Sequence, residues 1–170
     1  MKGEKDESLR KYLISLGMDP DYVPPKDDPR RVVISEFAIV FKDHDVTQKW
    51  TFNTPEDLKN VKKNPLVIKE KAEYKFRVTF RVQHNIVLGL KLVNTVFSKI
   101  KEVKDTQMFG SYPPSNEFKA YEFPTDGWHE APSGMAMRGE YKARMTFTDD
   151  DNKEHLTFDY VIKIAKDWKD

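Results

Sequence analysis

The chain has 170 residues and a mass of 20.0 kDa, which suits one domain or one domain with a tail. Its 29 basic and 28 acidic residues give a formal net charge of +1, so composition offers no reason to expect a nucleic acid or an anionic membrane as partner. The absence of cysteine excludes disulfides, thiolate catalysis and cysteine zinc sites. Because no apolar run is long enough to cross a membrane and the charged N-terminus is unlike a secretory signal, we expect a soluble, cytoplasmic protein.

The first 30 residues carry many charges and prolines, and they predict a flexible arm that contains one short helix. Asp6 and Ser8 are suitable N-cap residues, and Gly17 is a suitable C-cap. A helix of about ten residues is too short to be stable alone in water, so it docks either on its own domain or on a partner protein. Its apolar residues recur at i, i+3, i+4 and i+7: Leu9, Tyr12, Leu13 and Leu16.

From residue 31 onward the pattern becomes one of short strands, which predicts a single all-β domain over residues 31–170. The strand with the clearest sequence pattern is 73–83, in which apolar and polar residues alternate. We therefore expect one of its faces to be buried and the other to be solvent-exposed. Gly89 marks a bulge or a close approach of two backbones, and Thr54 followed by Pro55 opens a short helix at 54–62. Strands are predicted at 32–41, 49–52, 66–68, 73–83, 86–96, 141–147 and 156–164, a set typical of an antiparallel β-sandwich.

The sequence offers little catalytic chemistry. The four histidines are scattered singly, without the spacing of a metal site, and we interpret them as surface or hairpin residues. The run from Asp149 to Asp151 lacks the alternating ligands of a calcium loop, which favours a solvated hairpin turn. No phosphate-binding glycine loop or nucleophile elbow occurs, so we expect neither an enzyme nor a cofactor.

Two features suggest a binding function without identifying the ligand. Residues 101–130 hold three basic and six acidic residues, which is either an ordinary solvated surface or a docking site for a basic segment. The large apolar side chains of the alternating strands either fill a core or leave room between two sheets for an apolar ligand. The pattern alone does not choose between these alternatives.

Several stretches resemble the Rho GDP-dissociation inhibitors, in the same order and across essentially the whole chain. They are DESLRKY (6–12), VIKEKAEYKFRVTFRVQHNIVLGLK (67–91), GSY (110–112), EAPSGMAMRGEY (130–141), FTDDDNKEHL (147–156) and IAKDWKD (164–170). The resemblance implies an immunoglobulin-like sandwich preceded by a regulatory arm. It also implies binding of geranylgeranylated, GDP-bound Rho-family GTPases, slowed nucleotide exchange and extraction of the GTPase from membranes.

The resemblance further implies three sets of site residues. The arm would contact the GTPase switch regions through Asp6, Ser8, Leu9, Tyr12 and Leu16. The prenyl group would lie between the sheets among Phe37, Ile39, Leu66, Tyr74, Ile86, Leu90, Phe158, Tyr160 and Ile162. The basic stretch before the prenylated cysteine would meet Glu117, Glu122, His129 and Glu130.

The sequence departs from the family pattern at a few positions. Relatives often carry phenylalanine where Leu66 stands, tryptophan where Tyr160 stands and a second acid where His129 stands. The resemblance therefore does not fix the depth of the pocket or the preference between geranylgeranyl and farnesyl. Only five residues precede Asp6, whereas relatives usually carry an acidic segment there, so we expect a short form or a shortened chain.

Two other functions stay open at this point. A generic lipid-carrier sandwich would bind prenylated cargo without reading the switch regions, and it would bind a free prenyl-cysteine almost as tightly as the whole GTPase. A purely structural immunoglobulin-like domain would have no accessible cavity between its sheets.

Overall fold

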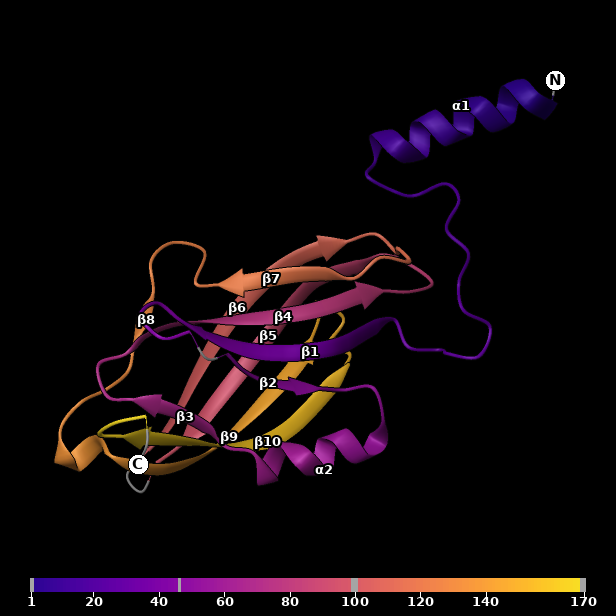
Figure 1. Cartoon of the computed structure of the whole chain (residues 1–170). Coiled ribbons are helices and arrows are strands. Elements are labelled where there is room, and N and C mark those ends of the chain that lie inside the picture. Colours follow the sequence, from indigo (N-terminus) through magenta and orange to yellow (C-terminus); the bar gives the residue numbers. More distant parts are fainter. Residues whose placement is uncertain (1, 46, 99–100, 169–170) are drawn as a thin grey trace.

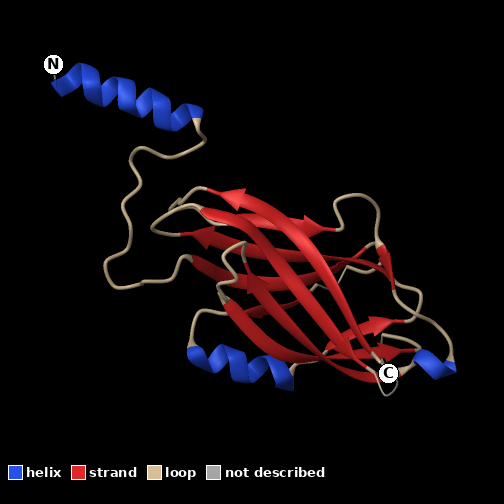
Figure 2. Ribbon diagram, turned by 180° about the vertical axis from the view of Figure 1, so that it is seen from behind, coloured by secondary structure: helices blue, strands red, loops and turns tan. Residues whose placement is uncertain are grey.

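The computed structural model describes residues 2–45, 47–98 and 101–168, with side chains from residue 7 onward. Its body consists of two five-stranded sheets packed face to face, and a helical arm projects from one end (Figures 1 and 2). The first sheet has the order β2 (Gln48–Thr51), β1 (Val32–Phe41), β4 (Glu73–Val82) and β7 (Lys119–Phe123), with β8 (His129–Glu130) also paired to β4. The second has the order β3 (Leu66–Lys69), β10 (Leu156–Ala165), β9 (Gly139–Thr148), β5 (Val87–Phe97) and β6 (Glu102–Tyr112).

The predicted sandwich is confirmed, and its core follows from the alternation of the strands. In β4 the residues Phe76, Val78, Phe80 and Val82 are buried, whereas the polar residues between them are half-buried on the outer face. Burial of such side chains is the main favourable contribution to folding. One pair departs from the expected antiparallel pattern, because β3 runs parallel to β10.

The helix α2 (Pro55–Lys63) carries the chain from β2 in the first sheet to β3 in the second (Figure 1). As predicted, Thr54 opens this helix, in a capping box in which the Asp57 carboxylate accepts the Thr54 backbone N–H at 3.0 Å. Val61 is the residue that α2 buries, with no exposed surface. The helix thus delivers the chain to the edge of the second sheet, where β3 pairs with β10.

The arm helix α1 spans Lys2–Ser15, so the prediction that Asp6 or Ser8 caps its start is wrong. Its end is confirmed at Gly17, which has a φ of 77°. The N–H of Gly17 donates to the Ile14 carbonyl, and the N–H of Met18 donates to the Leu13 carbonyl. This arrangement satisfies the last carbonyls of a helix, and glycine adopts the required positive φ without strain.

The predicted strands missed β6, β7 and β8. In β6 most residues are exposed, because it is the outer strand of the second sheet and carries charged side chains on both faces. An edge strand of this kind has no apolar alternation for sequence analysis to detect, and its charges discourage pairing with other chains. Gly89, by contrast, is confirmed as a bulge in β5 with a φ of 64°, where a Cβ would collide with the Asp150 carboxylate.

The predicted hairpin between β9 and β10 is confirmed and residues 150–154 are exposed, but Asp149 is not solvated. Asp149 is 3% exposed, and its carboxylate lies 2.7 Å from Nε2 of the buried His155 side chain. The same carboxylate accepts the N–H groups of Asp151 and Lys153 at 2.9 and 3.2 Å. His155 is therefore a structural residue rather than a surface histidine. Among the described residues, no cluster of potential metal ligands occurs, and no helix is long and apolar enough to cross a bilayer.

Candidate functional site

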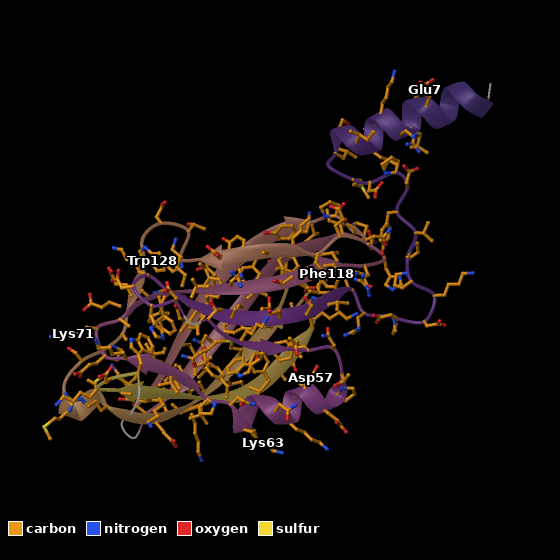
Figure 3. The ribbon with its side chains drawn as sticks, in the orientation of Figure 1. Glu7, Asp57, Lys63, Lys71, Phe118 and Trp128 are labelled. Carbon is orange, nitrogen blue, oxygen red and sulfur yellow. The ribbon has the colours of Figure 1, made fainter. Side chains whose placement is uncertain are left out.

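The arm presents an apolar stripe that its own domain does not cover. Leu9, Tyr12 and Leu16 are 55%, 59% and 55% exposed, and Ser8 is exposed beside them. Two opposite views show α1 standing clear of the sandwich, with Glu7 on the same projecting helix (Figures 1, 2 and 3). The side chain of Asp6, a further predicted contact, lies outside the described side chains. A helix that leaves large apolar residues in water has a surface available for a partner.

The segment that joins α1 to the body makes hydrogen bonds both within the arm and to the sandwich. Within the arm, the Arg10 guanidinium donates to both carboxylate oxygens of Asp21, at 2.5 and 3.1 Å. At the body, the Tyr22 hydroxyl accepts the N–H of His84 at 2.7 Å, and the His84 ring lies 2.5 Å from the carbonyl oxygen of Asp28. The β4–β5 turn thus holds the linker from Tyr22 onward, before the 31–170 domain begins.

The residues predicted to surround a prenyl group lie mostly between the sheets. Six are buried, two are partly buried against the core, and Ile86 is 38% exposed. The buried six are Phe37, Ile39, Leu66, Leu90, Phe158 and Tyr160, and the partly buried two are Tyr74 and Ile162. These residues come from both sheets, so they meet only because the sheets pack face to face.

Aromatic packing fills the space between the sheets. The Phe37 ring lies 5.7 Å from Trp50 and 5.1 Å from Phe76, and Tyr160 lies 5.5 Å from Trp50 across the layers. The Tyr160 hydroxyl donates to Oδ1 of Asn94 at 2.5 Å, and burial raises the pKa of this phenol above its usual value. A lipid chain would therefore have to displace side chains in order to enter.

Some apolar residues from both sheets pack against the core without being fully buried. Four of these residues pack against the core but remain partly exposed, and we call them the rim: Tyr74, Val96, Tyr141 and Ile162. Tyr141 and Ile162 are opposite each other in β9 and β10, and Val96 is paired with the next inward residue of β9, Ala143. Burial, and secondarily the charge of Asp105, raises the pKa of the Tyr74 hydroxyl. Because the rim side chains are only partly buried, they can move with less loss of packing than the fully buried residues.

The predicted acidic set divides between two places. His129 lies at the rim, with its ring 5.4 Å from Tyr74, and Glu130 follows it opposite Glu73 in β4. Glu122 faces Arg77 at 3.9 Å on the outer face of the first sheet, and Glu117 lies in the exposed segment before β7. The sequence interval 101–130 therefore does not form one continuous surface.

Sequence analysis missed acidic residues that the fold brings beside Glu130. A cavity of about 280 Å³ is lined by Glu130 together with Asp43, Glu70 and Glu73. Glu70 accepts two hydrogen bonds from Arg138, at 3.1 and 3.0 Å, which lower the pKa of its carboxyl. These residues lie before 101–130 in the chain, so no local charge count could have grouped them with Glu130.

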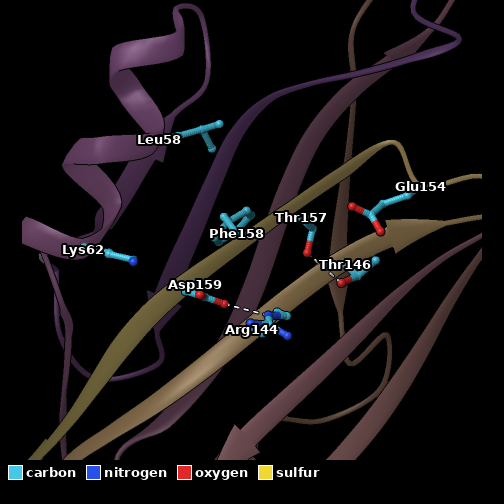
Figure 4. Close-up of a pocket in the computed structure, with 8 residues that line it drawn as sticks. All are labelled: Leu58, Lys62, Arg144, Thr146, Glu154, Thr157, Phe158 and Asp159. Atoms are coloured by element: carbon cyan, nitrogen blue, oxygen red, sulfur yellow. Dashed lines mark hydrogen bonds and ion pairs between the residues drawn. The ribbon is translucent and has the colours of Figure 1, made fainter.

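A larger cavity, of about 500 Å³, lies between α2 and the outer face of the second sheet (Figure 4). Its wall is polar: Arg144 donates to Asp159 at 2.7 Å, and the hydroxyls of Thr146 and Thr157 lie 2.9 Å apart. An apolar chain would have to desolvate these groups without replacing their hydrogen bonds. The cavity is therefore unsuited to a lipid chain.

Comparison with known proteins identifies relatives along the whole chain. A family profile described as "RHO protein GDP dissociation inhibitor" matches residues 1–167. The putative rho GDP-dissociation inhibitor 1 of Dictyostelium discoideum is 44% identical over 97% of this chain and 83% of its own length. The Rho GDP-dissociation inhibitor of Schizosaccharomyces pombe and the human Rho GDP-dissociation inhibitor 1 are each 37% identical over 97% of this chain, and over 79% and 78% of their own lengths.

Proposed function

The chain belongs to the Rho GDP-dissociation inhibitor family, and from this premise we propose how its two regions act. The arm binds the switch regions of a GDP-bound Rho-family GTPase and slows nucleotide exchange. The sandwich shelters the geranylgeranyl group of that GTPase between its sheets, so that the complex leaves the membrane for the cytoplasm. The chain is a regulator in this scheme and catalyses no reaction.

The observation that carries this proposal is the exposed stripe on α1. Leu9, Tyr12 and Leu16 are each more than half exposed, although the body buries many of its apolar residues almost completely. Exposed apolar side chains at helical spacing are the usual anchors of a helix that binds a protein groove. The arm orders on the partner at an entropic cost, which keeps the contact reversible.

The rim supports the lipid half of the proposal. A chain of about twenty carbons, at about 0.8 kcal/mol per buried CH₂, is held strongly by a bilayer. Entry past Tyr74 and Ile162 offers the same chain an apolar interior, which matches the bilayer but does not greatly exceed it. The free energy that drives extraction must therefore come from contacts with the GTPase protein, and neither region suffices alone.

In this proposal Glu130 and His129 meet a basic segment that precedes the lipid. Both residues belong to β8, and His129 contacts the rim residue Tyr74. A basic tail entering with the lipid would pass the carboxylates of Glu130 and Glu73 on its way to the rim. Opposite charges there would fix the orientation of the tail more than they would add affinity.

The test is extraction of a prenylated, GDP-loaded Rho GTPase from liposomes, together with nucleotide exchange on the same GTPase. The chain should release the GTPase and slow exchange, whereas a Leu9→Ala, Tyr12→Ala double variant should lose both effects and keep its fold. Leu58→Ala is the matched control, because Leu58 is an exposed leucine of the other helix, α2.

Two results would contradict the proposal. Equal binding of prenylated and unprenylated GTPase would exclude the sheltering of the lipid. Binding of a free prenyl-cysteine as tight as that of the whole GTPase would instead favour the generic lipid carrier that ignores the switch regions.

A further inference from the structure

The segment between β8 and β9 exposes an uncharged tip. Residues 132–137 (Pro-Ser-Gly-Met-Ala-Met) are six successive exposed residues without a charge, in a chain of which 34% is charged. Met135 is 83% exposed and Met137 is 40% exposed. We name these six residues the methionine turn; its last three form the short 3-10 helix η1 (Met135–Met137).

The methionine turn is held in place by hydrogen bonds at both ends. Glu70 accepts the N–H of Gly134 at 2.9 Å while it pairs with Arg138. The N–H of Met137 donates to the Gly134 carbonyl at 3.0 Å, and the Met137 carbonyl accepts the Tyr141 hydroxyl at 2.7 Å. The exposure of the methionines is thus imposed by the surrounding structure, since their backbone is anchored on either side.

The location of the turn connects it to the rim. It lies at the end of the sandwich farthest from α1, as the rear view shows (Figure 2). Its anchor Tyr141 is itself a rim residue, and the turn begins directly after the buried Ala131, whose N–H donates to the Ala72 carbonyl at 2.9 Å. A surface that the turn touches would therefore lie next to the entrance between the sheets.

The charged residues around the turn are of both signs, because Glu73 and Glu130 line the same cavity as Lys69 and Lys71. Lys69 and Lys71 are exposed on either side of Glu70, and Lys71 is labelled at this end of the molecule in Figure 3. Arg138 forms an ion pair with Glu70, so the segment 69–71 presents the charges of its two lysines. An apolar tip with lysines behind it suits an anionic lipid surface, in which the tip enters the headgroup region and the lysines meet the headgroups.

We propose that the methionine turn is a lipid-contacting tip that docks this end of the sandwich transiently on an anionic bilayer. The choice of a bilayer rests on the proposed function, because a lipid group must pass from the membrane to the adjacent rim. The tip is too small for a stable protein interface, which buries about 800 Å² on each partner. Unbranched methionine side chains adapt to the irregular boundary between headgroups and acyl chains.

The proposal is tested by co-sedimentation of the GTPase-free chain with vesicles of phosphatidylcholine, with and without phosphatidylserine. A Met135→Asp, Met137→Asp double variant should bind vesicles about tenfold more weakly, because two partly inserted side chains lose their apolar contact. The matched control is Met108→Asp, since Met108 is 49% exposed on the edge strand β6. Lys69→Glu with Lys71→Glu should weaken binding only to the vesicles that contain phosphatidylserine.

A separate readout distinguishes this proposal from the proposed function. Nucleotide exchange on a detergent-solubilised, prenylated GTPase involves no bilayer, so the methionine variant should slow exchange as well as the unmodified chain does. Loss of that inhibition in the variant would make the turn a protein contact and overturn the proposal. The proposal would also be overturned if the unmodified chain did not bind vesicles or if the methionine variant bound them equally well. It would likewise be overturned if Met108→Asp reduced vesicle binding to the same extent. An unmodified chain that binds vesicles through the turn but never slows exchange would refute the proposed function alone.

Discussion

The arm and the sandwich use the same kind of amphipathic pattern for opposite purposes. In β4 the alternating apolar residues lie inside the body, and Val78 has no exposed surface. In α1 the residues at helical spacing lie outside, and Tyr12 is 59% exposed. A periodic apolar pattern therefore predicts that one face of an element becomes buried. It does not show whether that face is buried against the same chain or against another molecule.

The difference has an energetic consequence. Each buried side chain of the sandwich adds to the stability of the free protein, whereas the stripe of α1 adds to the stability of a complex. Substitutions in the two regions should thus separate into those that unfold the chain and those that leave it folded but inactive.

The largest effect should come from Phe37→Ala. Phe37 is fully buried between Trp50 and Phe76, so its loss should lower the free energy of unfolding by about 3–5 kcal/mol. Leu9→Ala in the arm should change it by less than about 0.5 kcal/mol, because Leu9 is exposed. Urea unfolding followed by tryptophan fluorescence measures both values. Similar losses for the two variants would show that α1 packs on the body in solution.

The next largest effect concerns the buried turn of the sandwich. Asp149→Asn should destabilise the fold by about 3 kcal/mol, because it removes the charged partner of His155 and weakens the acceptor for two backbone N–H groups. Asp151→Asn is the matched control in the same turn, since Asp151 is exposed, and it should have little effect. Equal stabilities of the two variants in urea would argue against a buried pair.

The same carboxylate predicts a loss of stability in acid. Burial alone would raise the pKa of Asp149, but the hydrogen bonds from His155, Lys153 and Asp151 outweigh it and hold the pKa below its usual value. A lowered folded pKa contributes stability that is present above the unfolded pKa of about 3.9 and is lost as the pH falls through the folded value. The stability difference between the unmodified chain and Asp149→Asn should therefore shrink below about pH 4. Urea unfolding midpoints of both proteins measured across this pH range test the prediction. A difference between the two midpoints that stayed constant as the pH fell would contradict it.

Some elements of the fold could be predicted from the sequence and others could not. The bounds of β1 and the start of α2 were predictable, because alternation and a Thr-Pro cap are local signals. The buried pair of Asp149 and His155 was not, since its residues have the same composition as a solvated turn. The edge strand β6 was missed because solvent on its outer side removes the apolar pattern.

The candidate site shows the same division. The stripe of α1 and many of the buried inter-sheet residues could be named in advance, the first from spacing and the second from family resemblance. The rim residues Val96 and Tyr141 could not, because their partial exposure depends on how the two sheets pack together. The methionine turn was visible as sequence letters, but its exposure follows from the anchoring by Glu70 and Tyr141.

The smallest effect should appear where the two regions join. Tyr22→Phe removes the acceptor for the exposed N–H of His84, which water can replace, so the fold should lose less than about 1 kcal/mol. The next contact with the body is at Asp28, so the free linker after Ser15 lengthens from about seven to about thirteen residues. The effective concentration of the arm at its binding site falls as about the −3/2 power of linker length. This predicts that half-maximal inhibition of exchange needs about two- to threefold more protein.

The control is Tyr121→Phe, which removes a hydroxyl bonded within the body and should leave the half-maximal protein concentration unchanged. Inhibition by Tyr22→Phe at the unmodified concentration would show that the linker is free in solution and that the arm reaches its partner without an anchor.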